Sequence, residues 1–486
     1  MSLNTITYPK CKLTDPEPET GKRVRTLKIG AFLPRLLSIR CLLSSRLLTL
    51  LQDTLAERIR YVSDVRSTRR LPRVLPLALL LLALGCAAVP NIERIPGIVL
   101  GEPSFFPTIA GHTDAPIMGG NDVELLFNGE QIFPAMLSAI RSAHRSITYA
   151  QYLYEDGEIA YELAEAFAER CRAGVEVKIL IDSHGGKMPQ DIPVLWKESG
   201  CHMEWFRRVK LLQFITPWEL LSYNYRNHRR VLVIDGRIGF TGGHGVSQAW
   251  TGNGRMEKHW RETDVRVEGP IVQQLQAAFV EIWRQTTGEV LGDDRYFPRL
   301  QPRGKIYAQV VKSSPLNGTH ESYLLFLLSI TSAQKSIYIT NPYFVPDERM
   351  THALLQAVAR GVRVVVLGPG SIDWMLVYRA SRRGFGPLLL GGIELYEYQP
   401  ALLHAKTMVV DSIWALVGTT NLDNRSFALN EEINFIAYDA GIAGQLEKAF
   451  FEDLKRSKKL DYESWRGRPW SEKFLELFTI PLKEQL

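Results

Sequence analysis

The sequence predicts an α/β protein built from two pseudo-symmetric halves that share one reaction centre, with an extension before them. One phrase occurs twice, 176 positions apart, as His228 to Asp235 and as His404 to Asp411. Each copy reads His, any residue, a long cation, four apolar or nearly apolar residues, and Asp. Shorter matching stretches flank both copies in the same order, which indicates a duplicated domain rather than a solenoid of short repeats.

The N-terminal extension carries the positive charge of the chain. Residues 1–73 hold 15 Lys and Arg against 6 Asp and Glu, a net charge of +9, and the whole chain carries +6, which leaves −3 for residues 74–486. A nucleic-acid partner is therefore unlikely on charge grounds, because such partners require positive charge near the site. Two interpretations of residues 1–73 stay open: a basic surface segment, disordered or lying on anionic lipid, or a start assigned too early.

Residues 74–92 form an uncharged apolar run that follows Arg66, Arg69, Arg70 and Arg73. We expect a membrane anchor or an export signal, with Cys86 as a loose match to a lipidated cysteine; the alternative is a buried apolar helix. Cations before the run predict that the later domains are translocated. The expected location is therefore a cell membrane, with the protein anchored to it or associated with it.

The two predicted domains, residues 112–300 and 301–486, alternate helix and strand in the same order, which predicts right-handed crossovers and helix-covered sheets. Hydrophobic periodicity, with glycine at the ends of elements, predicts the elements of the first domain. They are helix Ile132–Ala143, strand Ser146–Tyr154, helix Ile159–Ala173 and strand Val175–Asp182. The second domain repeats this order: helix Ser322–Ala333, strand Ser336–Ile339, helix Met350–Arg360 and strand Val362–Leu367.

The repeated phrase is typical of a strand followed by a turn. Side chains two apart on a strand share a face, so the histidine and the cation of each phrase should point the same way. Asp235 and Asp411 lie an odd number of residues further on, and Asp235-Gly236 is a turn dipeptide. These aspartates are expected to hold the hairpins together rather than to touch substrate.

The five cysteines make neither a disulfide framework nor a metal-binding pair. Cys171 and Cys201 are expected to be buried thiols. No pattern of clustered histidines and cysteines predicts a metal, and we expect neither a metal nor another cofactor.

From about Val123 to the C-terminus, roughly three quarters of the chain, the sequence resembles the phospholipase D superfamily with two His-x-Lys-x4-Asp motifs, and within it the bacterial cardiolipin synthases. Beyond the two phrases, the resemblance is carried by these stretches: His259–Glu262, Ser336–Pro346, Gly418–Ser426, Asn430–Asn434 and Trp465–Trp470. It implies two phospholipase D-like α-β-α domains packed so that both histidines meet at their interface.

The residue types suit a phosphodiester. One neutral imidazole can attack phosphorus, a protonated one can donate to the leaving oxygen, and cations can stabilise the remaining oxygens. Arg230 and Lys406 would supply that charge. Pseudo-symmetry alone leaves the two histidine roles open, whereas the resemblance implies His228 as nucleophile and His404 as acid.

The resemblance also implies supporting residues. Glu262 and Glu432 would each orient the histidine that precedes it in the same half. Asn421 would donate to a phosphate oxygen, and Gly245 and Ser426 are the other expected substrate-binding positions.

Two departures from the family motif stand out. Arg230 replaces the first lysine, which is not a neutral exchange because arginine is bulkier and bidentate. Gly245 stands where the second half has Asn421, so one amide donor is missing, and backbone N–H groups of the glycine turn are the expected replacement. His244 is expected to be a loop residue.

The expected reaction passes a phosphatidyl group from a phospholipid such as phosphatidylglycerol to phosphatidylglycerol or another alcohol, through a phosphohistidine. Alternatives are hydrolysis by a phospholipase D or a nuclease, and a non-catalytic membrane scaffold. Residues 211–221 are expected either to line an acyl-chain groove or to cap the core, and residues 470–486 to lie on a membrane surface. One chain would suffice for one active site; the oligomeric state stays open.

Overall fold

The computed structural model describes residues 89–208, 224–477, 479, 480 and 485. The first half contains, in order, β1 (Met118–Phe127), α4 (Gly129–Arg141), β2 (Ser146–Gln151), α5 (Glu158–Arg172), β3 (Glu176–Asp182), α6 (Asp191–Glu198), β4 (His202–Phe206), β5 (Val231–Ile234), β6 (Ile238–Gly242), η2 (Gln248–Trp250), β7 (Thr263–Glu268), α8 (Val272–Thr287) and α9 (Asp293–Tyr296).

The second half repeats this order and adds a C-terminal strand and two helices. It contains β8 (Ile306–Ser313), η3 (Pro315–Asn317), α10 (Glu321–Ser332), β9 (Ser336–Thr340), α11 (Glu348–Ala359), β10 (Arg363–Pro369), α12 (Met375–Leu390), β11 (Glu394–Tyr398), β12 (Thr407–Val410), β13 (Trp414–Gly418), α13 (Asn424–Ala428), β14 (Glu432–Tyr438), α14 (Ala440–Leu454), β15 (Ser457–Leu460), α15 (Tyr462–Arg466) and α16 (Trp470–Leu477).

The eight elements expected from the alternation are confirmed. Helices α5 and α11 each end before a glycine with positive φ, Gly174 at 86° and Gly361 at 89°, a conformation that glycine adopts without strain. Two bounds are wrong by three residues: α4 begins at Gly129 rather than Ile132, and β2 stops at Gln151 rather than Tyr154. The chain leaves the sheet after Gln151, and the Tyr154 amide donates to the carbonyl of Gly185.

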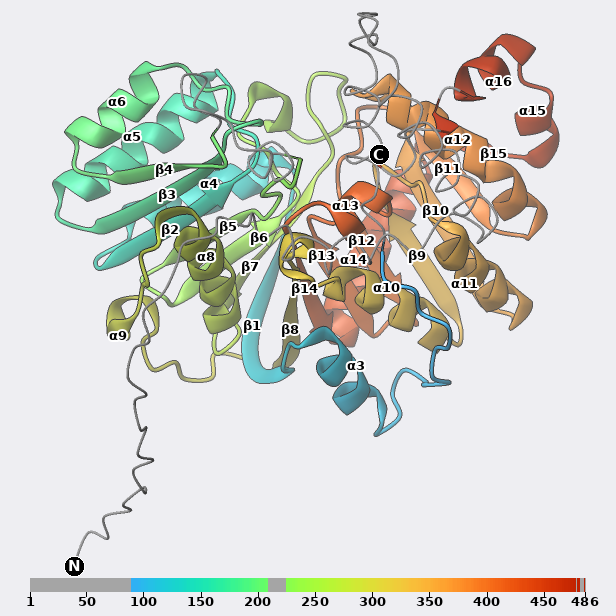
Figure 1. Cartoon of the computed structure of the whole chain (residues 1–486), viewed down its shortest axis with the longest axis horizontal. Coiled ribbons are helices and arrows are strands. Elements are labelled where there is room, and N and C mark those ends of the chain that lie inside the picture. The colour runs from blue at the N-terminus through green and yellow to red at the C-terminus, as the bar shows by residue number, and fades with distance from the viewer. Residues whose placement is uncertain (1–88, 209–223, 478, 481–484, 486) are drawn as a thin grey trace, which may run out of the picture. The chain divides into compact units, whose positions relative to one another are not determined.

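All strands in the described part of the chain belong to one sheet of 15, in the order β15-β11-β10-β9-β12-β13-β14-β8-β1-β7-β6-β5-β2-β3-β4 (Figure 1). Read outward from the central β8–β1 pair, the two arms carry equivalent strands, which is the pseudo-symmetry expected from the repeated phrase. The central pair is antiparallel, with a register irregularity between Met118 and Asn121.

The halves also share a core. Val265 and Val267 of β7 belong to the same buried cluster as Val417 of β13 and Phe435 of β14. Each such side chain contributes about 1.5–3 kcal/mol when fully buried. The halves are therefore joined both by strand pairing and by a shared core, and the described residues belong to one compact unit. The expected boundary between residues 300 and 301 stays a prediction.

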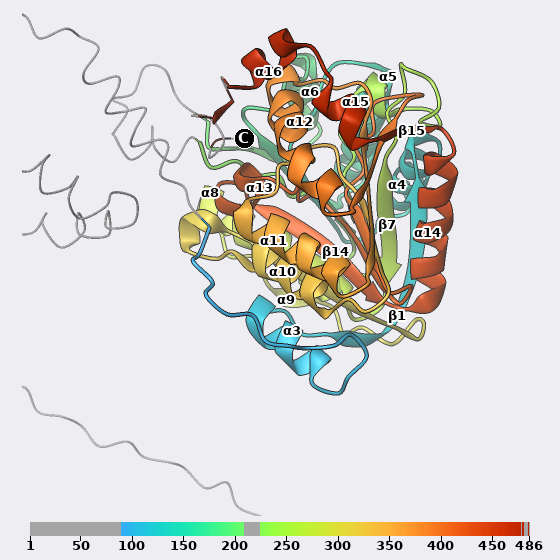
Figure 2. The same cartoon turned by 90° about the vertical axis from the view of Figure 1, so that its right-hand side faces the viewer.

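The helix α3 (Phe105–Thr113) was not expected. Phe105 and Ile109 are fully buried in the same cluster as Phe326 and Ile330 of α10, so the segment before the first half covers the core of the second half (Figure 2).

The expectation of free thiols at Cys171 and Cys201 is wrong. The two residues form a disulfide that links the end of α5 to the residue before β4, with Cα atoms 5.4 Å apart. Their separation of 30 residues gave no spacing signal, because the helix–strand–helix path that brings them together lies between them.

The membrane-related expectations fall largely outside the described residues: most of the run 74–92, all of 211–221, and positions 478, 481–484 and 486. Among the residues that are described, none of the helices has the length and apolar character to cross a bilayer.

Candidate active site

Both histidines of the repeated phrase lie in extended segments just before a strand, rather than in the strand as expected, since β5 begins at Val231 and β12 at Thr407. The histidine and the cation of each phrase do face the same way. The Arg230 guanidinium nitrogen lies 3.2 Å from His228 Nε2, and Lys406 Nζ lies 3.0 Å from His404 Nε2.

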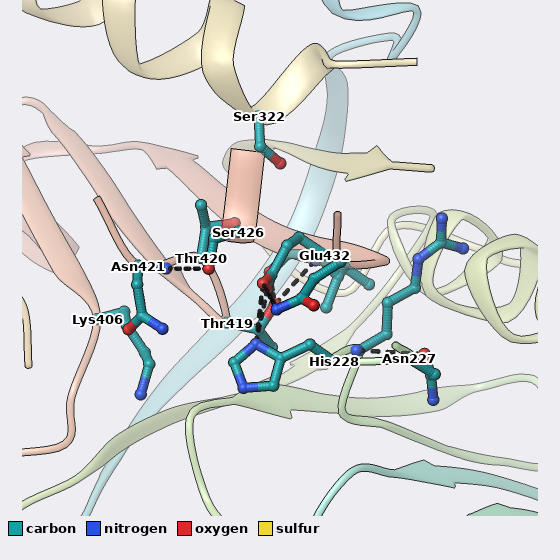
Figure 3. Close-up of polar contacts among 12 residues, drawn as sticks. Asn227, His228, Ser322, Lys406, Thr419, Thr420, Asn421, Ser426 and Glu432 are labelled. Carbon is teal, nitrogen blue, oxygen red and sulfur yellow. Dashed lines mark hydrogen bonds and ion pairs between the residues drawn. The ribbon is translucent and has the colours of Figure 1, made fainter. Parts of the chain in front are cut away.

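The carboxylates that orient the histidines are exchanged between the halves. His228 Nδ1 donates to Glu432, at 2.9 and 3.0 Å from its two oxygens, and His404 Nδ1 donates to Glu262 at 2.7 Å (Figure 3 shows the first pair). The expectation that each glutamate serves the histidine of its own half is therefore wrong. The backbone explains the exchange, because the His228 amide donates to the carbonyl of Glu431 and the His404 amide donates to that of Arg261.

Each carboxylate is held by further donors that the sequence did not predict. Glu432 accepts from the Thr419 hydroxyl and from Asn430 Nδ2 at 3.3 Å. Glu262 accepts from Trp250 Nε1 at 3.1 Å and from the backbone amide of Thr263 at 3.0 Å.

The two donor sets differ for a steric reason. Gly243 stands where the second half has Thr419, and a Cβ atom there would lie 2.4 Å from the carboxylate of Glu262. The Trp250 indole supplies the side-chain donor instead. Thr419 lies in the stretch Gly418–Ser426 that carries the family resemblance, so the sequence could have indicated it. Nothing in the repeat pattern marks Trp250.

Burial dominates the electrostatics of the site. It lowers the pKa of His404 to about 4, with help from the Lys406 charge, and it lowers the pKa of His228 against the opposing effect of Glu432. It also lowers the pKa of Lys406 to about 7. Burial opposes ionisation of Glu262, but the His404 hydrogen bond and the nearby charges outweigh it and lower its pKa to about 2.

Each cation also acts across the interface. The charge of Lys406 contributes to lowering the pKa of His228, and the charge of Arg230 contributes to lowering that of His404. Both imidazoles therefore lie within the electrostatic influence of both cations, and an arriving phosphodiester anion would favour protonation of one of them.

The expected substrate-binding residues lie in different situations. Asn421 is 5% exposed, and its Oδ1 is buried without a hydrogen-bond partner; in the view of Figure 3 it lies beside Lys406, to one side of His228. Ser426 Oγ accepts from the backbone N–H of Asn421 at 3.1 Å, so Ser426 positions the backbone at Asn421. A Cβ atom at Gly245 would lie 3.0 Å from the Trp250 ring, so the indole takes the space beside this position.

Asp235 and Asp411 do not join the histidines. Asp235 accepts from the backbone amides of His144, Arg145 and Ser146, and Asp411 accepts from the amides of residues 334–336. Each aspartate ties its β-hairpin turn to the loop before β2 or β9. They are structural groups, as the turn pattern indicated, and not part of the reaction centre.

His244 lies in the loop after β6, as expected, and its side chain is buried. Its ring lies 2.5 Å from Asp264 and edge-on to Phe133. In the matching place of the second half, Thr420 pairs with Asn434. Across the part of the chain that the structure describes, no group of three or more His, Cys, Asp or Glu side chains could hold a metal ion.

The sequence matches the family described as "Cardiolipin synthase, PLD-like domain" over residues 136–283 and 327–454, one segment in each half. The chain belongs to this family. It is 35% identical over 360 residues to cardiolipin synthase 2 of Staphylococcus epidermidis, covering 73% of this chain and 72% of the relative. It is also 33% identical over 368 residues to a cardiolipin synthase of Geobacillus kaustophilus, covering 74% and 72%.

Among solved structures, the chain resembles a phosphatidylserine synthase of Haemophilus influenzae. The TM-score is 0.57 at 14% identity, over 79% of this chain and all of the other, so the likeness concerns the fold. As a member of the PLD-like cardiolipin synthase family, the chain is a phospholipase D-type phosphatidyltransferase.

Proposed function

We propose that the enzyme joins two phosphatidylglycerol molecules into cardiolipin and glycerol by way of a covalent adduct on His228. The observation that carries the proposal is the pair of exchanged His–Glu contacts, because each places a donated proton on Nδ1 and leaves Nε2 beside the cation of its own phrase.

In the first step, His228 Nε2 attacks phosphorus. The P–N bond forms, the P–O bond to the departing glycerol breaks, and the leaving oxygen takes a proton from His404. Arg230 and Lys406 stabilise the charge on the remaining phosphoryl oxygens. Asn421 would donate from its Nδ2 group to one of these oxygens, and its placement beside Lys406 supports that role (Figure 3).

In the second step, a hydroxyl of another phosphatidylglycerol replaces the glycerol. His404 takes the hydroxyl proton, the new P–O bond forms and the P–N bond breaks, which restores both imidazoles. Water in place of the alcohol would give phosphatidic acid, so exclusion of water decides between transfer and hydrolysis.

The test uses purified protein in detergent with labelled phosphatidylglycerol and EDTA. We expect cardiolipin and glycerol, and added glycerol should reverse the reaction. His228→Ala should abolish turnover, whereas His352→Ala, on the exposed face of α11, is the matched control. Phosphatidic acid as the sole product would replace the transferase by a hydrolase, and cleavage of DNA without lipid turnover would reject both lipid activities.

We also propose that the catalytic halves lie on the oxidising side of the bacterial inner membrane. The Cys171–Cys201 disulfide supports this location, because disulfides persist in oxidising compartments. The arginines before residues 74–92 support the same orientation. Thiol labelling of denatured protein from cells lysed in a blocking reagent should find both cysteines protected; two free thiols would contradict the orientation.

A further inference from the structure

The C-terminal helix α16 turns its apolar side chains away from the protein. Trp470 is 75% exposed and Leu477 is 52% exposed, while Phe474 packs edge-on against Trp470 and is also about half exposed. The one buried residue within the helix is Glu476. A surface helix of a globular protein normally has the opposite arrangement, with its apolar face inward.

Polar contacts, not apolar ones, hold this helix in place. Arg468 donates to both oxygens of Glu476, at 2.8 and 2.6 Å, and its guanidinium lies 4.1 Å from the Trp465 ring centre. Trp465 is fixed on α12, because its Nε1 donates to the Arg382 carbonyl at 2.7 Å and its ring fills the space beside Gly386. The outward apolar side chains are therefore available for another contact.

A basic groove of about 320 Å³ lies between α16, α15 and α12. Arg383, Arg466, Arg468 and Lys473 line it, against the single acid Glu476, which is already paired with Arg468. Neither Arg383 nor Arg466 forms an ion pair with another described residue. The groove therefore places uncompensated positive charge directly beside the apolar side chains.

Described residues beyond α16 lie against α12 and α13. Figures 1 and 2 place α16 on the outer side of α12, and Thr479 lines a depression together with Ala380 and Arg383. Further along the chain, the carbonyl of Gln485 accepts from Arg425 Nε at 2.8 Å. Arg425 is the second residue of α13 and lies four residues after Asn421 in the sequence.

We propose that this C-terminal docking surface, formed by Trp470, Phe474, Leu477 and Ile480 with Arg383, Arg466 and Lys473, binds the headgroup layer of an anionic phospholipid bilayer. Aromatic and aliphatic side chains beside cations are the combination that an anionic membrane interface binds. Charge complementarity selects the bilayer over a second copy of the chain, whose equivalent surface would be equally positive.

The docking surface can be tested in the full chain, reconstituted in nanodiscs, with a fluorophore on a single cysteine. Leu477→Cys carries the NBD label in a background with serine at positions 11, 41 and 86, which leaves the disulfide intact. Val290→Cys, at a 78% exposed position beyond α8, is the matched control. Nitroxide-labelled lipid should quench the label at position 477 at least threefold more than the label at 290, in phosphatidylglycerol discs. Equal quenching at both positions would overturn the proposal.

Charge is tested with Arg466→Glu combined with Lys473→Glu, and with discs of phosphatidylcholine alone. Each lost cation should weaken surface binding by about fivefold. Quenching at position 477 should therefore fall both in the double variant and in discs of phosphatidylcholine alone. If neither does, the surface does not select anionic lipid. Concentration-dependent changes of the label in lipid-free detergent would instead indicate self-association and refute bilayer docking.

Activity provides a separate readout. Trp470→Ser with Leu477→Ser should lower the rate on bilayer substrate roughly tenfold more than the rate on micellar substrate. Val194→Ser, at an exposed apolar position of α6, should change neither rate. Equal losses in bilayers and micelles would mean a structural role only. The proposed function serves only to suggest the lipid; if phosphatidylglycerol is not turned over in micelles, that function fails while the fluorescence result still decides docking.

Discussion

Replacing Glu432 by Gln should disable His228, although the two residues belong to different halves. The substitution keeps the shape of the side chain and removes the charge that lies 2.9 and 3.0 Å from His228 Nδ1. When His228 attacks phosphorus, its ring becomes positively charged, and Glu432 is the carboxylate placed to stabilise that charge.

The magnitude follows from the geometry. Two unit charges about 4 Å apart interact by about 4 kcal/mol at an effective dielectric constant of about 20, which corresponds to roughly a thousandfold in rate. A comparable Asp→Asn change behind the catalytic histidine of a serine protease lowers kcat by about 10⁴. We therefore expect Glu432→Gln to lower kcat by about 10³–10⁴, with Glu447→Gln on α14, outside the reaction centre, as the control.

A rate loss alone would not prove the exchange between halves, so the histidine rings are observed directly. Nitrogen NMR of ¹⁵N-histidine-labelled enzyme, assigned with His228→Gln and His404→Gln, reports the tautomer of each ring. Glu432→Gln should shift the ring signals of His228, and Glu262→Gln those of His404. If each substitution instead shifts the histidine of its own half, the exchanged pairing is refuted.

Three further outcomes follow from the same contacts. Because burial lowers the pKa of Lys406 to about 7, its charge is lost as pH rises through that value, and kcat/KM should fall there. Lys406→Arg should keep the charge and abolish this fall in the accessible pH range. A fall that persists in the variant would contradict its assignment to Lys406. Gly243→Ala should lower kcat at least tenfold by displacing Glu262, whereas Gly384→Ala, with open space around its Cβ position, should not; equal kcat values would refute the steric argument. Cys201→Ser should lower the free energy of unfolding in urea by about 3–4 kcal/mol, for the 30-residue separation that the disulfide closes. A reducing agent should produce the same loss in the wild type and none in the variant, and a loss that persists in both would exclude the disulfide as its cause.

The sequence predicted what depends on local pattern. The repeated phrase located both histidines and their cations, and Gly174 and Gly361 marked the ends of α5 and α11. Asp235 and Asp411, which end the two phrases, were correctly expected in hairpin turns. For Asp235 the local signal is the turn dipeptide Asp-Gly.

The errors concern contacts made across the fold. Which glutamate reaches which histidine depends on backbone pairing of residue 228 with 431 and of residue 404 with 261, and spacing along the chain carries no information about it. The Cys171–Cys201 disulfide was missed for the same reason. Trp250 was not predicted, because its role depends on a steric clash in the folded protein. The Glu262 carboxylate leaves no room at position 243 for a side chain like that of Thr419.

The measurement that most directly tests the central claim uses His404→Ala with a phosphatidyl p-nitrophenol. This leaving group departs without a proton, so the variant needs only His228 to form the adduct, while the second step still needs His404 as base. A rapid burst of about one nitrophenolate per active site is expected, with the lipid covalently attached to His228 in the peptide map. Absence of a burst in His404→Ala, together with a burst in His228→Ala and lipid on His404, would contradict the account.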